Sequence, residues 1–163
     1  MEWHNEFTML AEIALSMLLG GIVGLERELA GKAAGLRTHM LVAGVSTFLV
    51  AMGDLLLLSY KLREMSELVR GDPFRIMGAI VTGLSFIGAG TIIQNKREDR
   101  VEGLTTAASL LFVGSIGISI ALQKFYLATG TTLLVLIINR LLISIEGRIS
   151  KRNKDKGKPP DNR

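Results

Sequence analysis

The sequence predicts an all-α fold, a polytopic transmembrane bundle of five membrane-spanning helices. Apolar residues gather in five blocks of 19 or 20 residues. At about 1.5 Å per residue, each block is long enough to cross the roughly 30 Å hydrocarbon core of a bilayer. Charged residues make up 21% of the chain and fall almost entirely between these blocks. Five buried helices of a soluble bundle are the alternative, but they would leave a chain of 163 residues almost no polar face for water.

Each expected element has its own signals. The first span contains Glu12, and neither Lys nor Arg precedes it, so it does not resemble a signal peptide. Apolar residues on one face of 61–70 predict a short amphipathic surface helix, and Asp72-Pro73 is typical of the start of the third span. We expect one membrane domain over 1–146 and a basic, disordered cytoplasmic tail over 147–163. The expected spans are approximately 7–25, 40–58, 74–93, 104–122 and 126–145.

The distribution of Lys and Arg predicts the orientation of the bundle. With the N-terminus outside, fourteen of these residues lie on the inner side and five on the outer side. Positive residues accumulate on the cytoplasmic side of membrane proteins. We therefore expect a multi-pass protein of the inner or plasma membrane, with its N-terminus outside and its C-terminus in the cytoplasm.

Composition excludes several classes of site. The chain has no Cys and only two His, which rules out disulfides and thiolate sites and makes a zinc site a poor prediction. No catalytic spacing of Ser, His and Asp is present, so we do not expect an enzyme. The net charge of +4 resides mostly in the C-terminal tail, and we interpret it as a topology signal rather than a nucleic-acid site. The 18 Gly form small-residue seams, which predict close helix packing and a homo-oligomer surrounded by membrane lipids.

A spacing of 68 residues recurs in the chain. Gly35-Leu36 opens the second expected span and Gly103-Leu104 opens the fourth, while Gly20 and Gly88 lie near the ends of the spans before them. A repeat of two helical hairpins would give this pattern, as in many transporters. Chance in a Gly-rich chain would give it equally well.

Two acidic residues lie within the expected spans. Glu12 and Asp54 each lie four or five residues outward of the midpoint of their span, at similar depth. Carboxylates are costly in hydrocarbon and seldom face lipid. Together they could bind a hydrated divalent cation such as Mg²⁺ or relay protons. Mg²⁺ is the only cofactor that the sequence suggests. Alternatively, each carboxyl group is simply protonated or hydrogen-bonded to a neighbouring helix.

A second polar group is expected at the cytoplasmic ends of the spans. Its members could bind an anionic ligand or a lipid headgroup at helix N-termini, or form a gate. They could equally form a salt-bridged ring that joins the helix ends, with Thr38 and Thr105 or Thr106 as caps. Asp72 and Arg75 form an outer motif, in which Arg75 could pair with Asp72 or Asp54. The residues of the cytoplasmic ring are Glu26, Arg27, Glu28, Arg37, Thr38, Gly88, Gly90, Thr105 and Thr106.

Five ordered motifs resemble those of the MgtC/SapB family of membrane proteins. The likeness runs from about Leu10 to Ile145, and it departs from many relatives at Leu111, where they often have Trp. The motifs are Gly20-Gly21-Ile22-Val23-Gly24-Leu25-Glu26-Arg27-Glu28, Gly35-Leu36-Arg37-Thr38-His39, Asp72-Pro73-Phe74-Arg75-Ile76, Gly83-Leu84-Ser85-Phe86-Ile87-Gly88-Ala89-Gly90-Thr91-Ile92 and Gly103-Leu104-Thr105-Thr106-Ala107-Ala108-Ser109.

The resemblance implies an inner-membrane protein associated with magnesium or ion homeostasis, which binds or transports a cation. Some members of the family instead modulate other membrane proteins, such as ATP synthase, without transport of their own. We expect only the membrane domain here, without the C-terminal soluble domain of longer members.

Overall fold

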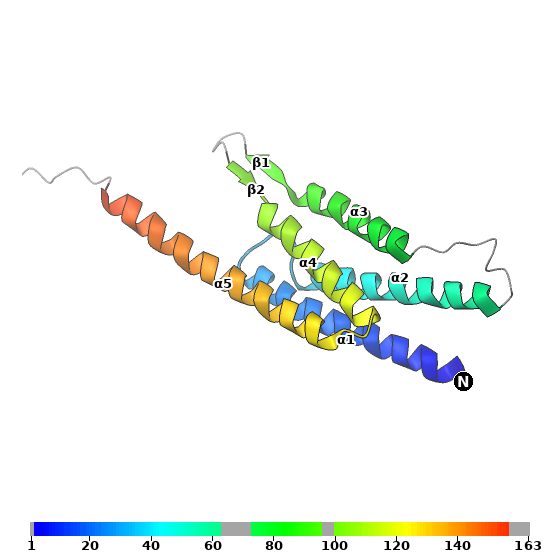
Figure 1. Ribbon diagram of the computed structural model, residues 1–163. Helices are drawn as coiled ribbons and strands as arrows, with labels where there is room; N and C mark the ends of the chain where they lie inside the picture. Colours follow the sequence, from blue (N-terminus) through cyan, green and yellow to red (C-terminus); the bar gives the residue numbers. More distant parts are fainter. Residues whose placement is uncertain (1, 63–72, 96–99, 157–163) are drawn as a thin grey trace, which may run out of the picture.

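The computed structural model describes residues 2–62, 73–95 and 100–156, and its architecture is helical. Five helices follow one another along the chain, with a short hairpin of two antiparallel strands before the fourth (Figure 1). The sequence did not predict this hairpin. The elements are α1 (Glu2–Leu29), α2 (Leu36–Leu62), α3 (Pro73–Thr91), β1 (Ile93–Asn95), β2 (Arg100–Glu102), α4 (Leu104–Ala121) and α5 (Phe125–Lys156).

Four of these helices, α1 to α4, contain segments long and apolar enough to cross a membrane. The described residues of α5 add a shorter apolar segment, Phe125–Leu141. The helix itself continues to Lys156, through much of the segment expected to be a disordered tail. The expected amphipathic helix over 61–70 lies almost wholly outside the described residues, as does Asp72.

The surface of the bundle has the chemistry that a bilayer requires. Large apolar side chains project outward from every helix, among them Leu10 on α1, Phe86 on α3 and Leu134 on α5. Outward hydroxyl groups donate to carbonyl oxygens of their own helix, as Thr82 does to Gly78 over 2.8 Å and Ser115 does to Leu111 over 3.0 Å. Polar groups without water must be satisfied internally. The protein is therefore a helical membrane protein.

Helix α4 lies at the centre of the bundle and packs against the other four helices (Figure 1). The side chains of Leu110, Val113, Ile116 and Ile120 are fully buried along it. A Cβ on Gly117 would collide with the carbonyl oxygen of Ala43. Helices α2 and α4 thus approach to backbone contact, as small residues allow in membrane bundles.

The contacts support the interpretation of the 68-residue spacing as a repeat of two hairpins, α1–α2 and α3–α4. A Cβ on Gly20 would lie 2.7 Å from the carbonyl oxygen of His39, and one on Gly88 would lie 3.2 Å from the Cβ of Ala107. Gly88 lies 68 residues after Gly20, and Ala107 lies 68 residues after His39, so the two contacts are equivalent in the repeat. Helices α2 and α4 also run parallel, because Thr47 Oγ1 donates to Gly117 O over 2.9 Å and His39 contacts Ser109. Their N-termini therefore lie at the same end of the bundle, as expected.

Two turns determine how the hairpins close. The turn after α1 is a Schellman motif, in which Gly31 N donates to Glu28 O and Lys32 N to Arg27 O, both over 3.0 Å. Gly31 has a φ of 66°, a left-handed conformation that suits glycine. The turn after α4 repeats this pattern with Gln123, whose φ is 57°, in the glycine position.

Candidate functional site: an acidic cavity and a buried polar cluster

The first site is a small cavity where α1 and α2 meet the α4–α5 turn. Its volume is about 230 Å³, and both Glu12 and Asp54 line it. Glu12 is 9% exposed, whereas Asp54 is exposed at the open side. The structure thus brings together the two carboxylates that the sequence placed at one depth. The cavity lies at the end of the bundle, because Ala121 at the end of α4 and Gln123 in the turn before α5 line it.

Gln123 completes this cavity, although no pattern in the sequence predicts its role. Its side chain lines the cavity with Glu12 and Asp54, and its amide interacts with the Glu12 carboxyl group. A residue other than glycine in the left-handed region costs about 1–2 kcal/mol. The fold therefore holds a strained residue where Gly would be favoured, and the strained residue is the one whose amide reaches Glu12. Such strain is a recognised sign of a functional position.

The carboxylate groups that line the cavity suit a hydrated cation better than a cation without bound water. No three His, Cys, Asp or Glu side chains gather anywhere in the described part of the chain. Mg²⁺ keeps several of its waters and commonly uses only one or two carboxylates. Six waters occupy about 180 Å³ at roughly 30 Å³ each, and the cavity of about 230 Å³ has room for them.

The second site is a polar cluster at the opposite ends of α1 and α2. Arg27 is buried, and its Nε and Nη2 donate to the two carboxylate oxygens of Glu26, each over 2.7 Å. Asn139 on α5 donates a further bond of 3.1 Å to the same carboxylate. Glu28 accepts from Leu36 N over 2.8 Å, so its carboxylate occupies the positive N-terminus of α2. The chain itself supplies the anion at this helix end.

His39 and Ser109 extend this cluster between α2 and α4. His39 is fully buried, and its Nδ1 lies 2.9 Å from Gly35 O. Because a carbonyl oxygen only accepts, the ring donates at this nitrogen. Its Nε2 lies 3.0 Å from Ser109 Oγ, which donates to Thr106 O over 2.8 Å. The ring thus links the starts of two parallel helices.

The expected cytoplasmic ring is only partly assembled by these contacts. Glu26, Arg27 and Glu28 join α1 to α2 and α5, and Thr106 takes part in the His39 network through its carbonyl oxygen. Gly88 packs against α4, whereas Gly90, Arg37 and Thr105 are exposed and Thr38 is half-buried. The described contacts therefore bring some members of the ring together and leave the others apart.

The expected threonine caps are wrong. Helix α4 begins after Gly103, which has a φ of 89° and provides no side-chain cap. A Cβ at Gly103 would collide with Thr91 O, so the close approach of α3 selects glycine at the position where a capping side chain would stand. Helix α2 begins at Leu36, which places Thr38 inside its first turn, and Glu28 from α1 caps it instead.

Of the outer motif, only Arg75 lies among the described residues. Arg75 is exposed and lines a groove between α2 and α3, whereas Asp54 lines the cavity between α1 and α2. The described residues include no ion pair between the two. Pairing of Arg75 with Asp72 falls outside the described residues.

His39, Ser109 and Asn139 were not among the predicted site residues. The count of two histidines argues against a zinc site and predicts no other role for His39. The feature that marks His39 is close packing, because Gly20 and Gly24 on α1 both face it. A Cβ on Gly24 would lie 2.8 Å from the Cβ of His39. Asn139 had no such signal, because its partner Glu26 lies 113 residues away.

Comparison with known proteins places these sites in a family. The MgtC family matches residues 13–148. Protein MgtC of Brucella abortus is 36% identical over 145 residues, covering 87% of this chain and 54% of the relative. YhiD of Escherichia coli K12, whose name proposes that it transports magnesium, is 32% identical over 154 residues, covering 89% of this chain and 67% of the relative.

Protein SapB of Bacillus subtilis is 30% identical over 139 residues, covering 85% of this chain and 58% of the relative. The chain spans from about half to two thirds of the length of these curated relatives. No solved structure matches it. The match over residues 13–148 begins one residue after Glu12 and includes Asp54, the polar cluster around Arg27 and the α4–α5 turn. It shows that the chain belongs to the MgtC family.

Proposed function

We propose that this chain is a five-span, non-enzymatic membrane protein of ion homeostasis that binds a hydrated divalent cation, with Mg²⁺ as the leading candidate. Glu12 and Asp54 are the proposed ligands, and Gln123 positions Glu12. The observation that carries the proposal is their shared cavity of about 230 Å³, completed by a strained turn residue. The name of YhiD, which proposes magnesium transport, agrees with it.

The packing of α5 supports a fifth span. Its apolar segment, Phe125–Leu141, covers about 25 Å at 1.5 Å per residue. It packs against α1 and α4, both of which are long enough to cross the membrane. A helix alongside two spanning helices crosses with them, and the excess of Lys and Arg then favours an outside N-terminus. The acidic cavity would open on the outer side.

Cation binding is tested with the purified protein in lipid vesicles. We expect Mg²⁺ to bind the wild type, measured by calorimetry, and Asp54→Asn and Glu12→Gln each to weaken binding by about tenfold or more. Glu6→Gln is the matched control, because Glu6 is an exposed carboxylate on the same helix that does not line the cavity. Unchanged Mg²⁺ affinity in Asp54→Asn and Glu12→Gln would overturn the proposal.

Flux separates transport from binding. Vesicles loaded with a Mg²⁺-sensitive dye should show uptake through the wild type and a loss of uptake in Asp54→Asn if the protein is a transporter. Binding without flux would favour a sensor or regulator that uses the same cavity.

One observation favours the second candidate, a regulatory protein that modulates other membrane proteins, ATP synthase among the candidates. Helix α3 exposes a stripe of small residues at steps of four, three and four: Gly78, Thr82, Ser85 and Ala89. A Cβ on Gly78 would meet nothing within 4 Å, so a helix of another protein or of a second copy could approach closely there. This candidate predicts co-purification with one membrane partner and no flux in the wild type, and Gly78→Leu should abolish the co-purification.

A further inference from the structure

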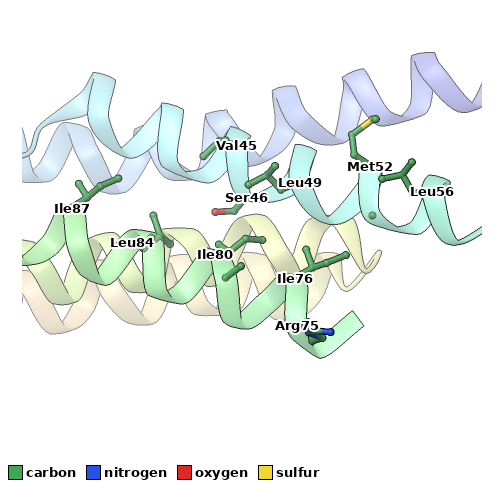
Figure 2. Close-up of a pocket in the computed structure, with 13 residues that line it drawn as sticks. Val45, Ser46, Leu49, Met52, Leu56, Arg75, Ile76, Ile80, Leu84 and Ile87 are labelled. Atoms are coloured by element: carbon green, nitrogen blue, oxygen red, sulfur yellow. The ribbon is translucent and has the colours of Figure 1, made fainter. Parts of the chain in front are cut away.

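A groove of about 580 Å³ runs between α2 and α3, away from the acidic cavity. Figure 2 shows aliphatic side chains lining both of its walls, with Leu49 and Met52 on α2 and Ile80 and Leu84 on α3. Its one charged residue among the described lining residues is Arg75, which lies at the end of the groove where α3 begins (Figure 2). The groove is therefore an apolar channel with a cation at one end.

The hairpin repeat explains why this groove is open. The repeat relates α1 to α3 and α2 to α4. The groove between α2 and α3 is therefore the counterpart of the junction between α4 and α1. Helix α5 packs on that junction. The described chain has no sixth helix to pack on the α2–α3 side in the same way. One junction is thus covered by protein, and its counterpart faces the bilayer.

The length of the groove matches one leaflet. Its lining on α3 runs from Arg75 to Ile87, which is about 18 Å at 1.5 Å per residue. Half of the roughly 30 Å hydrocarbon core is about 15 Å. An extended acyl chain that entered the groove at the membrane surface would therefore fill it along its length.

Arg75 specifies the headgroup. Its side chain is exposed, and no hydrogen bond or ion pair joins it to another residue in the described part of the chain. It lies in the first turn of α3, where the helix dipole adds further positive charge. A partner helix packed into the groove would remove this cation from water without neutralising it, whereas a phosphate would accept its N–H groups.

We propose that the α2–α3 groove binds one acyl chain of an anionic phospholipid, whose phosphate is held by Arg75. Under the proposed topology this lipid belongs to the outer leaflet. The groove shares no lining residue with the acidic cavity, so replacing the proposed Mg²⁺ ligands would leave its apolar walls and Arg75 in place.

The test uses native mass spectrometry of the full chain, purified in detergent with equal amounts of phosphatidylglycerol and phosphatidylcholine of the same acyl chains. We expect the wild type to retain phosphatidylglycerol with about tenfold preference, the gain from one charge-assisted contact. Arg75→Gln should retain both lipids alike. Excess inorganic phosphate should not displace the lipid, because the acyl chain contributes much of the binding.

Two leucine variants separate the groove from the rest of α3. Gly83 lines the groove, and a Cβ there would meet nothing within 4 Å, so Gly83→Leu should fill the groove without a clash. It should lose retention of both lipids. Gly78 on the same helix has equally open space but does not line the groove, so Gly78→Leu should retain lipid like the wild type.

Three outcomes would overturn the proposal. In the first, Gly83→Leu retains as much phosphatidylglycerol as the wild type although circular dichroism shows it folded. In the second, inorganic phosphate displaces the lipid, which would identify a simple anion site. In the third, the wild type retains no lipid and forms a dimer that Gly83→Leu disrupts, which would identify a helix of a second copy as the occupant.

Discussion

Gly24 offers the most direct test of how α1 and α2 are held together. Its ideal Cβ would lie 2.8 Å from the Cα of Leu36, 2.8 Å from the Cβ of His39 and 2.9 Å from the carbonyl oxygen of Gly35. Two of these three atoms belong to the backbone, so a change of rotamer cannot relieve the contacts. Gly24→Ala must therefore separate the helices.

The cost of this separation follows from the distances. Carbon atoms pack comfortably at about 3.5 Å or more, so the helices must move apart by about 0.7 Å. A gap of this size forfeits a quarter to a half of each dispersion contact along the interface, and overpacking of this kind typically costs about 1–3 kcal/mol. Alanine returns up to about 1 kcal/mol in helix propensity. Because several neighbours shift together, we expect a net loss of about 2 kcal/mol.

The measurement is the free energy of unfolding from titration with SDS in mixed micelles, followed by circular dichroism. Gly78→Ala is the matched control, because a Cβ at Gly78 would meet nothing within 4 Å. This control should keep or slightly raise the stability of the wild type. If Gly24→Ala proved as stable as Gly78→Ala, the inference that α1 and α2 meet at backbone contact would be refuted.

Three further changes test other parts of the fold. Gly103→Ala should lower stability by more than about 2 kcal/mol in the same titration, because it combines a φ of 89° with a collision against Thr91; wild-type stability would contradict this. Arg27→Met should cost about 3–5 kcal/mol by removing the cation that binds both oxygens of the Glu26 carboxylate, and a neutral result would show that the pair is dispensable. Gln123→Gly should leave stability within about 1 kcal/mol of the wild type while weakening Mg²⁺ binding several-fold in calorimetry; undiminished binding would remove the amide from the site.

The sequence predicted what depends on spacing along a helix. Hydropathy located all five helices, and helical rise placed Glu12 and Asp54 at one level, where the structure shows a shared cavity. Both predictions rest on the regular geometry of an α-helix, in which the depth of a side chain follows from its position in the sequence. The 68-residue spacing belongs to the same class, since Gly20 and Gly88 contact equivalent positions on α2 and α4.

The sequence failed where a partner comes from another element. Thr38 and Thr106 have the residue type of a cap, but the helix starts are determined by Glu28 from α1 and by the collision that a side chain at Gly103 would make with Thr91. The role of Gln123 could not be predicted either, because its partner Glu12 lies on another helix. Its segment, Leu-Gln-Lys, contains none of the glycine that normally marks a left-handed turn, and only the assembled bundle shows that its amide meets Glu12.

The asymmetry between the two hairpins connects the sites. In the α1–α2 hairpin, a buried ion pair, a carboxylate cap and the fully buried His39 hold together the helix ends at the α1–α2 turn, and α5 covers the junction with α4. In the α3–α4 hairpin the equivalent approach is looser, because a Cβ on Gly88 would lie 3.2 Å from Ala107, whereas one on Gly20 would lie 2.7 Å from His39 O. A tightly joined half that carries the acidic cavity is thus set against a looser half that faces lipid. Occupancy of the α2–α3 groove would restrain α3 where no helix does, and cation binding at Glu12 would act on the α4–α5 turn. Both ligands would therefore act on the central helix α4, one through α3 and the other through the turn that follows it.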